Sequence, residues 1–296
     1  MPAPGDGVEE IAPAKINLAL HVLGRRPDGF HELESLVAFS PGAGDRLSFA
    51  PADRDGLEIT GPFAAALSSD GDNLVARARD HLREAFAGHP CPPVQIGLEK
   101  NLPVASGLGG GSSDAAAALH GLAKLWGLPD DSRVGAIAER LGADVPMCLF
   151  AKPLIARGSG ERLEPLPDFP ALAVVLANPG VSLATAAVFA ALASRENPGL
   201  PPLPPSPGFS ALLAWLRQTR NDLEPPASTL APEIRDVLAA LDGAGAAFSR
   251  MSGSGATCFG LFATPVEAAQ AALALASEQP GWFIKGTIAE PLHHAA

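Results

Sequence analysis

A glycine-rich segment carries the residues whose types and spacing point most directly to chemistry. Residues 101–127 read NLPVASGLGGGSSDAAAALHGLAKLWG, with glycines and serines ahead of an alanine-rich stretch. Glycine lets the backbone approach a ligand closely, and the first turn of a helix offers unpaired N–H groups at its positive end. The segment therefore predicts an anion cradle, above all for phosphate. A glycine-rich turn with a serine cap is the structural alternative.

The spacing of these residues excludes several other motifs. No glycine-lysine pair precedes Ser or Thr, so there is no Walker A sequence, and a GxGxxG match from Gly107 fails at Ser112. The tripeptide APE at Ala231 stands without the HRD and DFG motifs of protein kinases, and no serine lies in a GxSxG elbow. The strand pattern before the glycines and the helix pattern after them still favour a phosphate site.

Two segments in which apolar and other residues alternate are predicted to form strands that position this cradle. One is residues 14–22, where Lys15 and Asn17 share a face roughly 7 Å apart. Its period predicts a half-buried strand, because apolar and other residues alternate strictly. The apolar set is Ile16, Leu18, Leu20 and Val22, and the other set is Lys15, Asn17, Ala19 and His21. The second is residues 94–99, which lead directly into the glycine segment.

Further elements follow from periodicity and from turn residues. Val134, Ile137, Ala138 and Leu141 have helical spacing, and Ser132 and Gly142 are predicted to cap the two ends of that helix. Residues 171–180 predict a buried strand that ends in a turn, and residues 181–193 predict a helix. Residues 197–208 predict a loop, because their prolines lack N–H donors and restrict their neighbours.

Composition limits the class of protein. The chain has 296 residues, 47% of them hydrophobic, a formal charge of -11 and a pI near 5.0. That length predicts two domains and that apolar content predicts a packed core. The negative charge argues against nucleic acid or a membrane surface as the main partner. Apolar periodicity lapses near residues 151–160, so we expect domains at 1–157 and 158–296.

Location and redox state follow from what the sequence contains. The N-terminal MPAPGDGVEE lacks the basic and apolar regions of a signal peptide, and no apolar run reaches the ~18 residues of a membrane helix. We therefore expect a cytoplasmic protein. Cys91, Cys148 and Cys258 are odd in number and widely spaced, which favours reduced, buried thiols over disulfides or zinc.

The segment PVASGLGGGSSDAA resembles the phosphate-binding motif of the GHMP kinases, small-molecule kinases named for galactose, homoserine, mevalonate and phosphomevalonate. Four other segments extend the resemblance over nearly the whole chain: PAKINL (13–18), RPDGFHELES (26–35), GADVP (142–146) and GSGATCFGLF (253–262). The resemblance implies an α/β protein of the α+β type, with the two-domain GHMP kinase fold and with ATP and substrate in the inter-domain cleft. PAKINL, DGFHEL and GADVP together resemble the branch that phosphorylates the 2-position hydroxyl of a cytidine diphosphate-linked methylerythritol in non-mevalonate isoprenoid synthesis.

The resemblance also implies roles for individual residues. Asp144 is implied as the catalytic base and Lys15 as the cation beside it. The implied substrate contacts, around the cytosine and the alcohol, are Asn17, Phe30, His31, Thr185 and Phe189. The implied ATP-binding residues are Asn73, Leu74, Lys100, Pro103, Val104, Ala105, Ser106, Gly107, Leu108, Gly109, Gly110, Gly111, Ser112 and Ser113. Mg²⁺ is implied with the nucleotide, but no carboxylate can be named as its ligand.

Each of these roles has a structural alternative. Asp144 could only cap a short helix, and Asn73 could begin an ordinary one. Lys15 could be a solvated strand residue, His31 a surface or core imidazole, and both phenylalanines core residues. The family usually has Tyr at position 30, whereas this chain contains no Tyr, so a hydrogen bond from that hydroxyl is lost. Two other functions stay open: a GHMP kinase for another small alcohol, and a non-catalytic nucleotide-binding module.

Overall fold

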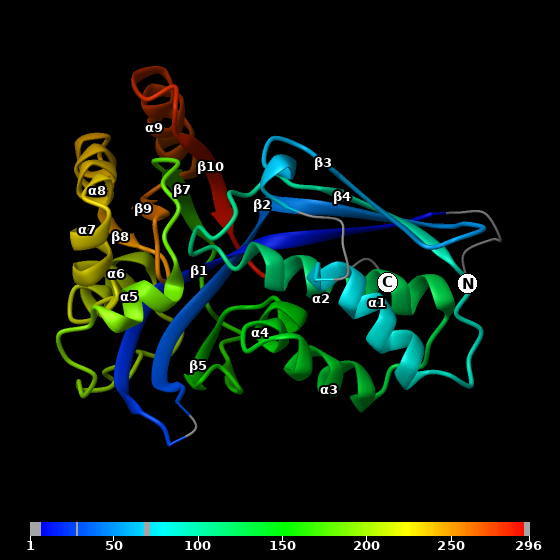
Figure 1. Cartoon of the computed structure of the whole chain (residues 1–296). Helices are drawn as coiled ribbons and strands as arrows, with labels where there is room; N and C mark the ends of the chain where they lie inside the picture. The colour runs from blue at the N-terminus through cyan, green and yellow to red at the C-terminus, as the bar shows by residue number, and fades with distance from the viewer. Residues whose placement is uncertain (1–6, 28, 68–71, 293–296) are drawn as a thin grey trace. The chain divides into compact units, whose positions relative to one another are not determined.

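The computed structural model describes residues 7–27, 29–67 and 72–292, in which strands and helices are mixed (Figure 1). Residues 1–6 of the N-terminal stretch and Asp28 of the 26–35 motif lie outside this description. The strands are β1 (Val8–Arg25), β2 (His31–Pro51), β3 (Gly56–Thr60), β4 (Val94–Glu99), β5 (Leu154–Gly158), β6 (Arg162–Pro165), β7 (Leu172–Asn178), β8 (Phe248–Met251), β9 (Cys258–Phe262) and β10 (Phe283–Ala289). The helices are α1 (Leu74–Ala85), α2 (Gly110–Trp126), α3 (Ser132–Leu141), α4 (Val145–Phe150), α5 (Thr185–Ala190), α6 (Phe209–Leu216), α7 (Glu224–Leu230), α8 (Glu233–Gly243) and α9 (Pro265–Glu278), with a 3₁₀ turn at Ala64–Ala66.

The described chain forms two compact units from interleaved segments. The first contains residues 7–14, 44–67, 72–104 and 109–150, and the second contains 15–27, 29–43, 105–108 and 151–292. The glycine-rich segment contributes to both. A single boundary at 157/158 stays a prediction, because it divides the chain by sequence order rather than by compact unit.

In the first unit, β4 pairs antiparallel with the end of β2 and parallel with β3. Val94, Ile96 and Leu98 are buried and alternate with more exposed residues, which confirms the strand predicted from the alternating pattern. Helices α1, α2, α3 and α4 pack against one another. The ring of Phe49 on β2 lies so close to α2 that a Cβ at Gly121 would be 2.2 Å from Cε2. The small side chains of α2 therefore allow the close packing on a sheet that the sequence predicts.

In the second unit, β7 lies at the centre of a four-stranded antiparallel sheet of order β10-β7-β9-β8. All seven residues of β7 are buried, which confirms the predicted buried strand. Helices α8 and α9 pack against this sheet (Figure 1). Their buried residues share one apolar cluster with alternate residues of β7. The cluster draws on Val175 and Ala177 of β7, Ile234, Val237 and Leu241 of α8, and Ala268, Ala271 and Leu275 of α9.

The prediction of a half-buried strand at 14–22 is wrong in one respect. The segment is part of β1, but both of its faces are buried, with Lys15 at 6% and His21 at 0% exposure. The polar side chains are covered because they have polar partners. The ring of His21, for example, bonds to Pro198 and Arg220.

Two predicted elements have different ends. Helix α3 begins at Ser132 as a helical residue, and its N-cap is Asp131, whose side chain accepts from the backbone N–H of Arg133 at 2.7 Å. The predicted cap at Ser132 was therefore one residue late, whereas Gly142 is the C-cap as predicted. Helix α5 is shorter than the predicted 181–193, because Val188 is its single buried residue and the ends gain little from packing.

The remaining predictions on the chain as a whole are simpler. Residues 197–208 contain no helix or strand, as their prolines predict. Cys148 and Cys258 are buried free thiols, whereas Cys91 is partly exposed and so is not the buried residue expected. Among the described helices, none combines the length and the apolar character needed to cross a membrane.

Candidate functional site

The start of α2 is an open helix N-terminus formed by glycines. Gly109 is the N-cap in the left-handed conformation, with φ 64°, and no side chain caps the helix. The alternative of a turn with a serine cap is therefore not what the structure has. A side chain at Gly111 would find Leu74 Cδ1 as its nearest neighbour, at 3.7 Å. The first turn of this 17-residue helix can thus accept an anion at its positive end.

Residues 105–108 of the glycine segment belong to the second unit, and hydrogen bonds to their backbone carbonyls hold them in place. Leu108 O accepts from Lys15 N at 2.8 Å, and Ser106 O accepts from Thr257 N at 3.0 Å. The hydroxyl of Ser252 donates to Gly107 O at 2.9 Å. Ala105 has φ 51°, which is uncommon for a residue with a Cβ. The segment is therefore fixed to β1 and to the turn that follows β8.

A buried charge cluster lies beneath the start of α2 in the first unit. The ammonium of Lys100 forms ion pairs with Asp45 and, at 2.6 Å, with Asp114. A Cβ at Gly110 would lie 3.0 Å from that nitrogen. Asp45 is fully bonded, because its Oδ1 also accepts from two backbone N–H groups, whereas Asp114 Oδ1 has no partner among the described residues.

The charges in this cluster depend on one another. Burial opposes the charge of Lys100, but Asp114 and Asp45 outweigh it and raise the pKa of the ammonium. Burial also raises the pKa of Asp114, against the attraction of Lys100. The side chains of Asp45 and Asp114 therefore hold the ammonium of Lys100, and its implied role in ATP binding stays a prediction.

The other implied nucleotide residues have clear structural positions. Asn73 is the N-cap of α1, since its side chain accepts from Val75 N at 2.9 Å, so the ordinary helix start is present. Leu74 lies beside the start of α2, as the distance to Gly111 shows. Ser113 is buried and donates to Pro13 O at 2.8 Å, which ties α2 to β1. Their contacts with ATP stay predictions, as do those of Pro103, Val104 and Ser112.

Asp144 lies between α3 and α4 in the first unit and is partly exposed. Its carbonyl accepts from Cys148 N at 3.2 Å, and Val145 N donates to Gly142 O at 3.1 Å. The residue thus sits at the beginning of a short helix, as its structural alternative requires. Lys15 belongs to the second unit, so the pairing of Lys15 with Asp144 stays a prediction.

In the second unit the structure brings together two of the implied cytosine contacts. His31 and Phe189 are stacked, with 4.5 Å between ring centroids. The His31 Nε2 atom is buried and has no partner among the described residues. Burial, followed by the charges of Arg195 and Arg25, lowers the pKa of His31, so the imidazole is neutral near pH 7. Phe30 is 58% exposed and is therefore not a core residue.

The remaining implied substrate contacts, Asn17 and Thr185, border the turn 252–255. Thr185 Oγ1 lies 2.8 Å from Ser254 Oγ. Asn17 N donates to Ser252 Oγ at 3.0 Å, and the Asn17 amide donates to Ser35 Oγ at 2.7 Å. The structure thus assembles a polar patch from β1, β2, α5 and the turn 252–255, all within one unit.

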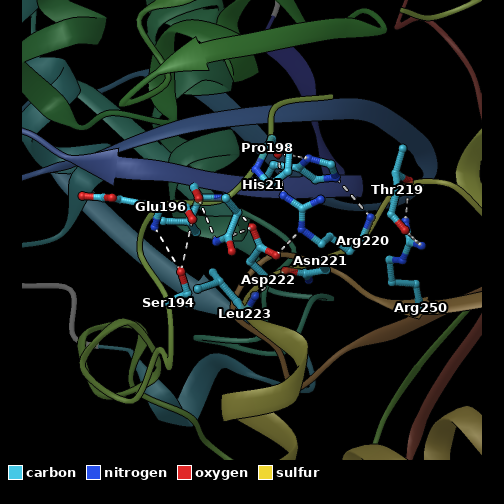
Figure 2. A network of polar contacts seen from close by, with 12 residues as sticks. His21, Ser194, Glu196, Pro198, Thr219, Arg220, Asn221, Asp222, Leu223 and Arg250 are labelled. Atoms are coloured by element: carbon cyan, nitrogen blue, oxygen red, sulfur yellow. Dashed lines mark hydrogen bonds and ion pairs between the residues drawn. The ribbon is translucent and has the colours of Figure 1, made fainter. Parts of the chain in front are cut away.

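A network of polar contacts beside this patch was not predicted from the sequence (Figure 2). The amide of Asn221 donates to Met251 O and Gly253 O, both at 2.8 Å, and so holds the turn from behind. Asp222 accepts from Val22 N at 2.7 Å and from Arg220 Nε at 2.6 Å. The polar run Arg-Asn-Asp shortly after the apolar helix α6 is the signal that could have predicted it.

No described group of three or more His, Cys, Asp or Glu side chains could hold a metal ion. The chain offers this geometry: an open helix N-terminus, a buried cation beneath it, a stacked histidine and an exposed aromatic side chain.

Comparisons with known proteins identify the family of the chain. The model of the GHMP kinases N terminal domain matches residues 73–152, and that of the GHMP kinases C terminal matches residues 207–281. The chain is 56% identical to a 4-diphosphocytidyl-2-C-methyl-D-erythritol kinase of Mesorhizobium japonicum over 93% of this chain and 94% of that protein. A protein of the same name from Chelativorans sp. is 54% identical over 95% of each chain.

Solved structures show the same relationship. A crystal structure of 4-(cytidine 5'-diphospho)-2C-methyl-D-erythritol kinase is 39% identical, with a TM-score of 0.77 over 95% of this chain and 99% of that one. Homoserine kinase from Cytophaga hutchinsonii, 21% identical with a TM-score of 0.69 over 98% of this chain and 96% of that one, shares the fold. The mixed α/β fold predicted from the motifs is thereby confirmed, and the chain belongs to the GHMP kinase family.

Proposed function

We propose that this chain transfers the γ-phosphoryl group of ATP to the 2-position hydroxyl of 4-diphosphocytidyl-2-C-methyl-D-erythritol, a step of non-mevalonate isoprenoid precursor synthesis. The observation that carries this proposal is the 56% identity with a kinase of that name over 93% of the chain. The stack of His31 on Phe189 also supports it, because aromatic side chains of this kind can stack on a cytosine ring.

The nucleotide is proposed to bind at the glycine segment. The N–H groups at the start of α2, with the helix dipole behind them, would hold its phosphates. ATP supplies the phosphoryl group, and Mg²⁺ would arrive with it, since phosphate oxygens and waters provide most of its ligands. Lys100 lies beneath this turn, but Asp45 and Asp114 balance its charge, so the attraction for phosphate would come from the backbone N–H groups.

The alcohol is proposed to bind at the polar patch of the second unit. Phe30, His31 and Phe189 would contact the cytosine, and the neutral His31 ring would offer Nε2 to the base edge. Asn17 and Thr185 would bind polar groups of the substrate. Asp144 would accept the hydroxyl proton, and Lys15 would offset the negative charge of the transferring phosphoryl group.

The test is phosphorus NMR of the purified chain with ATP, Mg²⁺ and 4-diphosphocytidyl-2-C-methyl-D-erythritol, which is called the cytidyl alcohol below. A new phosphomonoester signal that grows as ADP appears supports the proposal. Phosphorylation of another alcohol, but not this one, in a panel of small alcohols would replace it with a different GHMP kinase activity. Binding of ATP without consumption in the presence of every alcohol would leave a nucleotide-binding module.

A further inference from the structure

The side chain of Asn17 contains a buried acceptor without a partner. Asn17 is 4% exposed, and its Oδ1 atom makes no hydrogen bond to any part of the chain that the structure describes. Its Nδ2 atom and its backbone N–H are both bonded, to Ser35 Oγ and Ser252 Oγ. An unsatisfied buried acceptor costs about 1–3 kcal/mol, so a buried polar atom of this kind needs an explanation.

The neighbours of Asn17 determine which way its amide points. Ser35 Oγ lies 2.7 Å from the carbonyl oxygen of Ala19, which can only accept. The single hydroxyl proton of Ser35 is therefore used there, and Ser35 Oγ can only accept from Asn17. The group 2.7 Å from Ser35 must be the NH₂ of Asn17, because a flipped amide would place two acceptors against each other.

This orientation directs Oδ1 to the turn 252–255. A Cβ built on Gly253 would lie 3.2 Å from Asn17 Oδ1, so the acceptor faces the backbone of that residue. The carbonyl of Gly253 is turned away to Asn221, at 2.8 Å. Thr185 reaches the same turn through Ser254. The unpaired acceptor thus lies in the patch assigned above to the alcohol.

We propose that Ser35 is a positioning residue, which fixes the Asn17 amide so that Oδ1 accepts a hydrogen bond from a hydroxyl of the bound alcohol. Ser35 itself does not touch the substrate. The two hydrogen bonds, from Asn17 NH₂ to Ser35 Oγ and from the Ser35 hydroxyl to Ala19 O, can run in one direction only. They therefore leave Asn17 with an acceptor, not a donor, toward the substrate. This inference rests on the proposed function, because it assumes an alcohol at this patch.

The test compares Ser35→Ala with Ser35→Thr in steady-state assays of both substrates. Ser35→Ala leaves the Asn17 NH₂ without its acceptor and frees the amide to rotate. We expect the KM for the cytidyl alcohol to rise about threefold to tenfold, the worth of one hydrogen bond. The KM for ATP should stay unchanged, and Ser35→Thr, which keeps the hydroxyl, should restore the KM for the alcohol.

A double-variant cycle separates positioning from packing. If Ser35 acts through Asn17, the double variant Ser35→Ala with Asn17→Ala should have the same alcohol KM as Asn17→Ala alone. Additive effects, or an equal loss for ATP and alcohol, would overturn the proposal. Should Ser35→Ala fail to fold, Ser35→Cys keeps the size with a much weaker acceptor, and it should raise the alcohol KM in the same way.

The outcomes also distinguish this inference from the proposed function. A wild-type chain that does not phosphorylate the cytidyl alcohol refutes the proposed function. A wild-type chain that does so, with an alcohol KM changed less than about twofold by Ser35→Ala, refutes the positioning role alone.

Discussion

The imidazole of His31 stacks on the ring of Phe189, with 4.5 Å between the centroids and 23° between the ring planes. The residue before it, Phe30, has a side chain that is 58% exposed. Because an exposed ring contributes little to the core, Phe30 can be changed without unpacking the His31–Phe189 stack. It is therefore the residue of choice for testing where the cytosine binds.

Phe30→Ala should raise the KM for the cytidyl alcohol, since stacking on an aromatic side chain is worth about 1–3 kcal/mol per base. Phe30→Tyr should preserve activity, because the ring remains. Leu273→Ala removes another exposed apolar side chain and is the matched control. It should leave the KM for ATP and the KM for the cytidyl alcohol unchanged. An unaltered alcohol KM for Phe30→Ala would place the cytosine elsewhere.

Gly111→Ala tests the phosphate site at the start of α2. The added methyl group has its nearest protein neighbour at 3.7 Å, an ordinary contact, so the fold should persist. A phosphate close to the helix N-terminus would meet that methyl group, and the Kd for ATP measured by calorimetry should rise. Gly135→Ala in α3, where nothing lies within 4 Å, is the control. Equal ATP affinity in both variants would show that the phosphates of ATP do not bind at the start of α2.

The buried cluster beneath α2 predicts unequal effects of its members on stability. Burial raises the pKa of Asp114, so the folded state favours its neutral form and loses stability as pH rises above the ordinary aspartate range. Asp114→Asn imitates that uncharged form and should change the free energy of unfolding in urea at pH 7 very little. Lys100→Met leaves the buried carboxylate of Asp45 without its cation and should cost about 3–5 kcal/mol. Similar losses in both variants would contradict this reading of the cluster.

His21 predicts a pH dependence of stability. Its Nδ1 lies 3.0 Å from Pro198 O and must donate, whereas its Nε2 accepts from Arg220 N (Figure 2), so both nitrogens are occupied in the neutral ring. Burial, then the charge of Arg220, lowers the pKa of His21 below its ordinary value. The unfolded chain therefore binds a proton first as pH falls below about 6.5.

The contribution of His21 to stability should accordingly be complete above pH 6.5 and be lost at lower pH, by at most about 1.4 kcal/mol per pH unit. Thermal unfolding between pH 5 and 8 measures it. His21→Gln should flatten that slope, whereas the exposed His89→Gln should keep it. A slope that is the same in all three proteins would show that His21 does not titrate on unfolding.

Local patterns predicted the elements, and contacts between distant residues account for what they missed. The strand at 94–99, the long helix after the glycines and the proline loop each follow from their own residues. The ion pairs of Lys100 join residues 55 and 14 positions apart, so no local pattern contains them. The buried polar face of β1 was missed because Lys15 and Asn17 resemble solvated strand residues until their partners are known. The cap of α3 was misplaced because Asp131 and Ser132 are both good N-cap residues.

Asp144 is the residue on which the proposed mechanism rests, and its position at the beginning of α4 allows two roles. If it accepts the hydroxyl proton, Asp144→Asn should lower kcat by about 10²–10⁴, the usual contribution of a general base. Folding and ATP affinity should be retained, since Asn caps a helix about as well as Asp. If capping is the whole role, Asp144→Asn should be nearly silent, and Asp144→Ala should cost about 0.5–2 kcal/mol of stability with kcat retained.

Lys15 supplies the last test of that mechanism. Lys15→Ala should also lower kcat, because the transferring phosphoryl group would lose the cation that is proposed to offset its negative charge. The double variant Lys15→Ala with Asp144→Asn should lose less than the product of the two single losses, since residues that act as one unit are not additive. Single-turnover rates with saturating ATP measure the chemical step directly. Strictly multiplicative losses would mean that Lys15 and Asp144 act independently. Near-normal turnover by Asp144→Asn would show that Asp144 is not the acceptor of the hydroxyl proton.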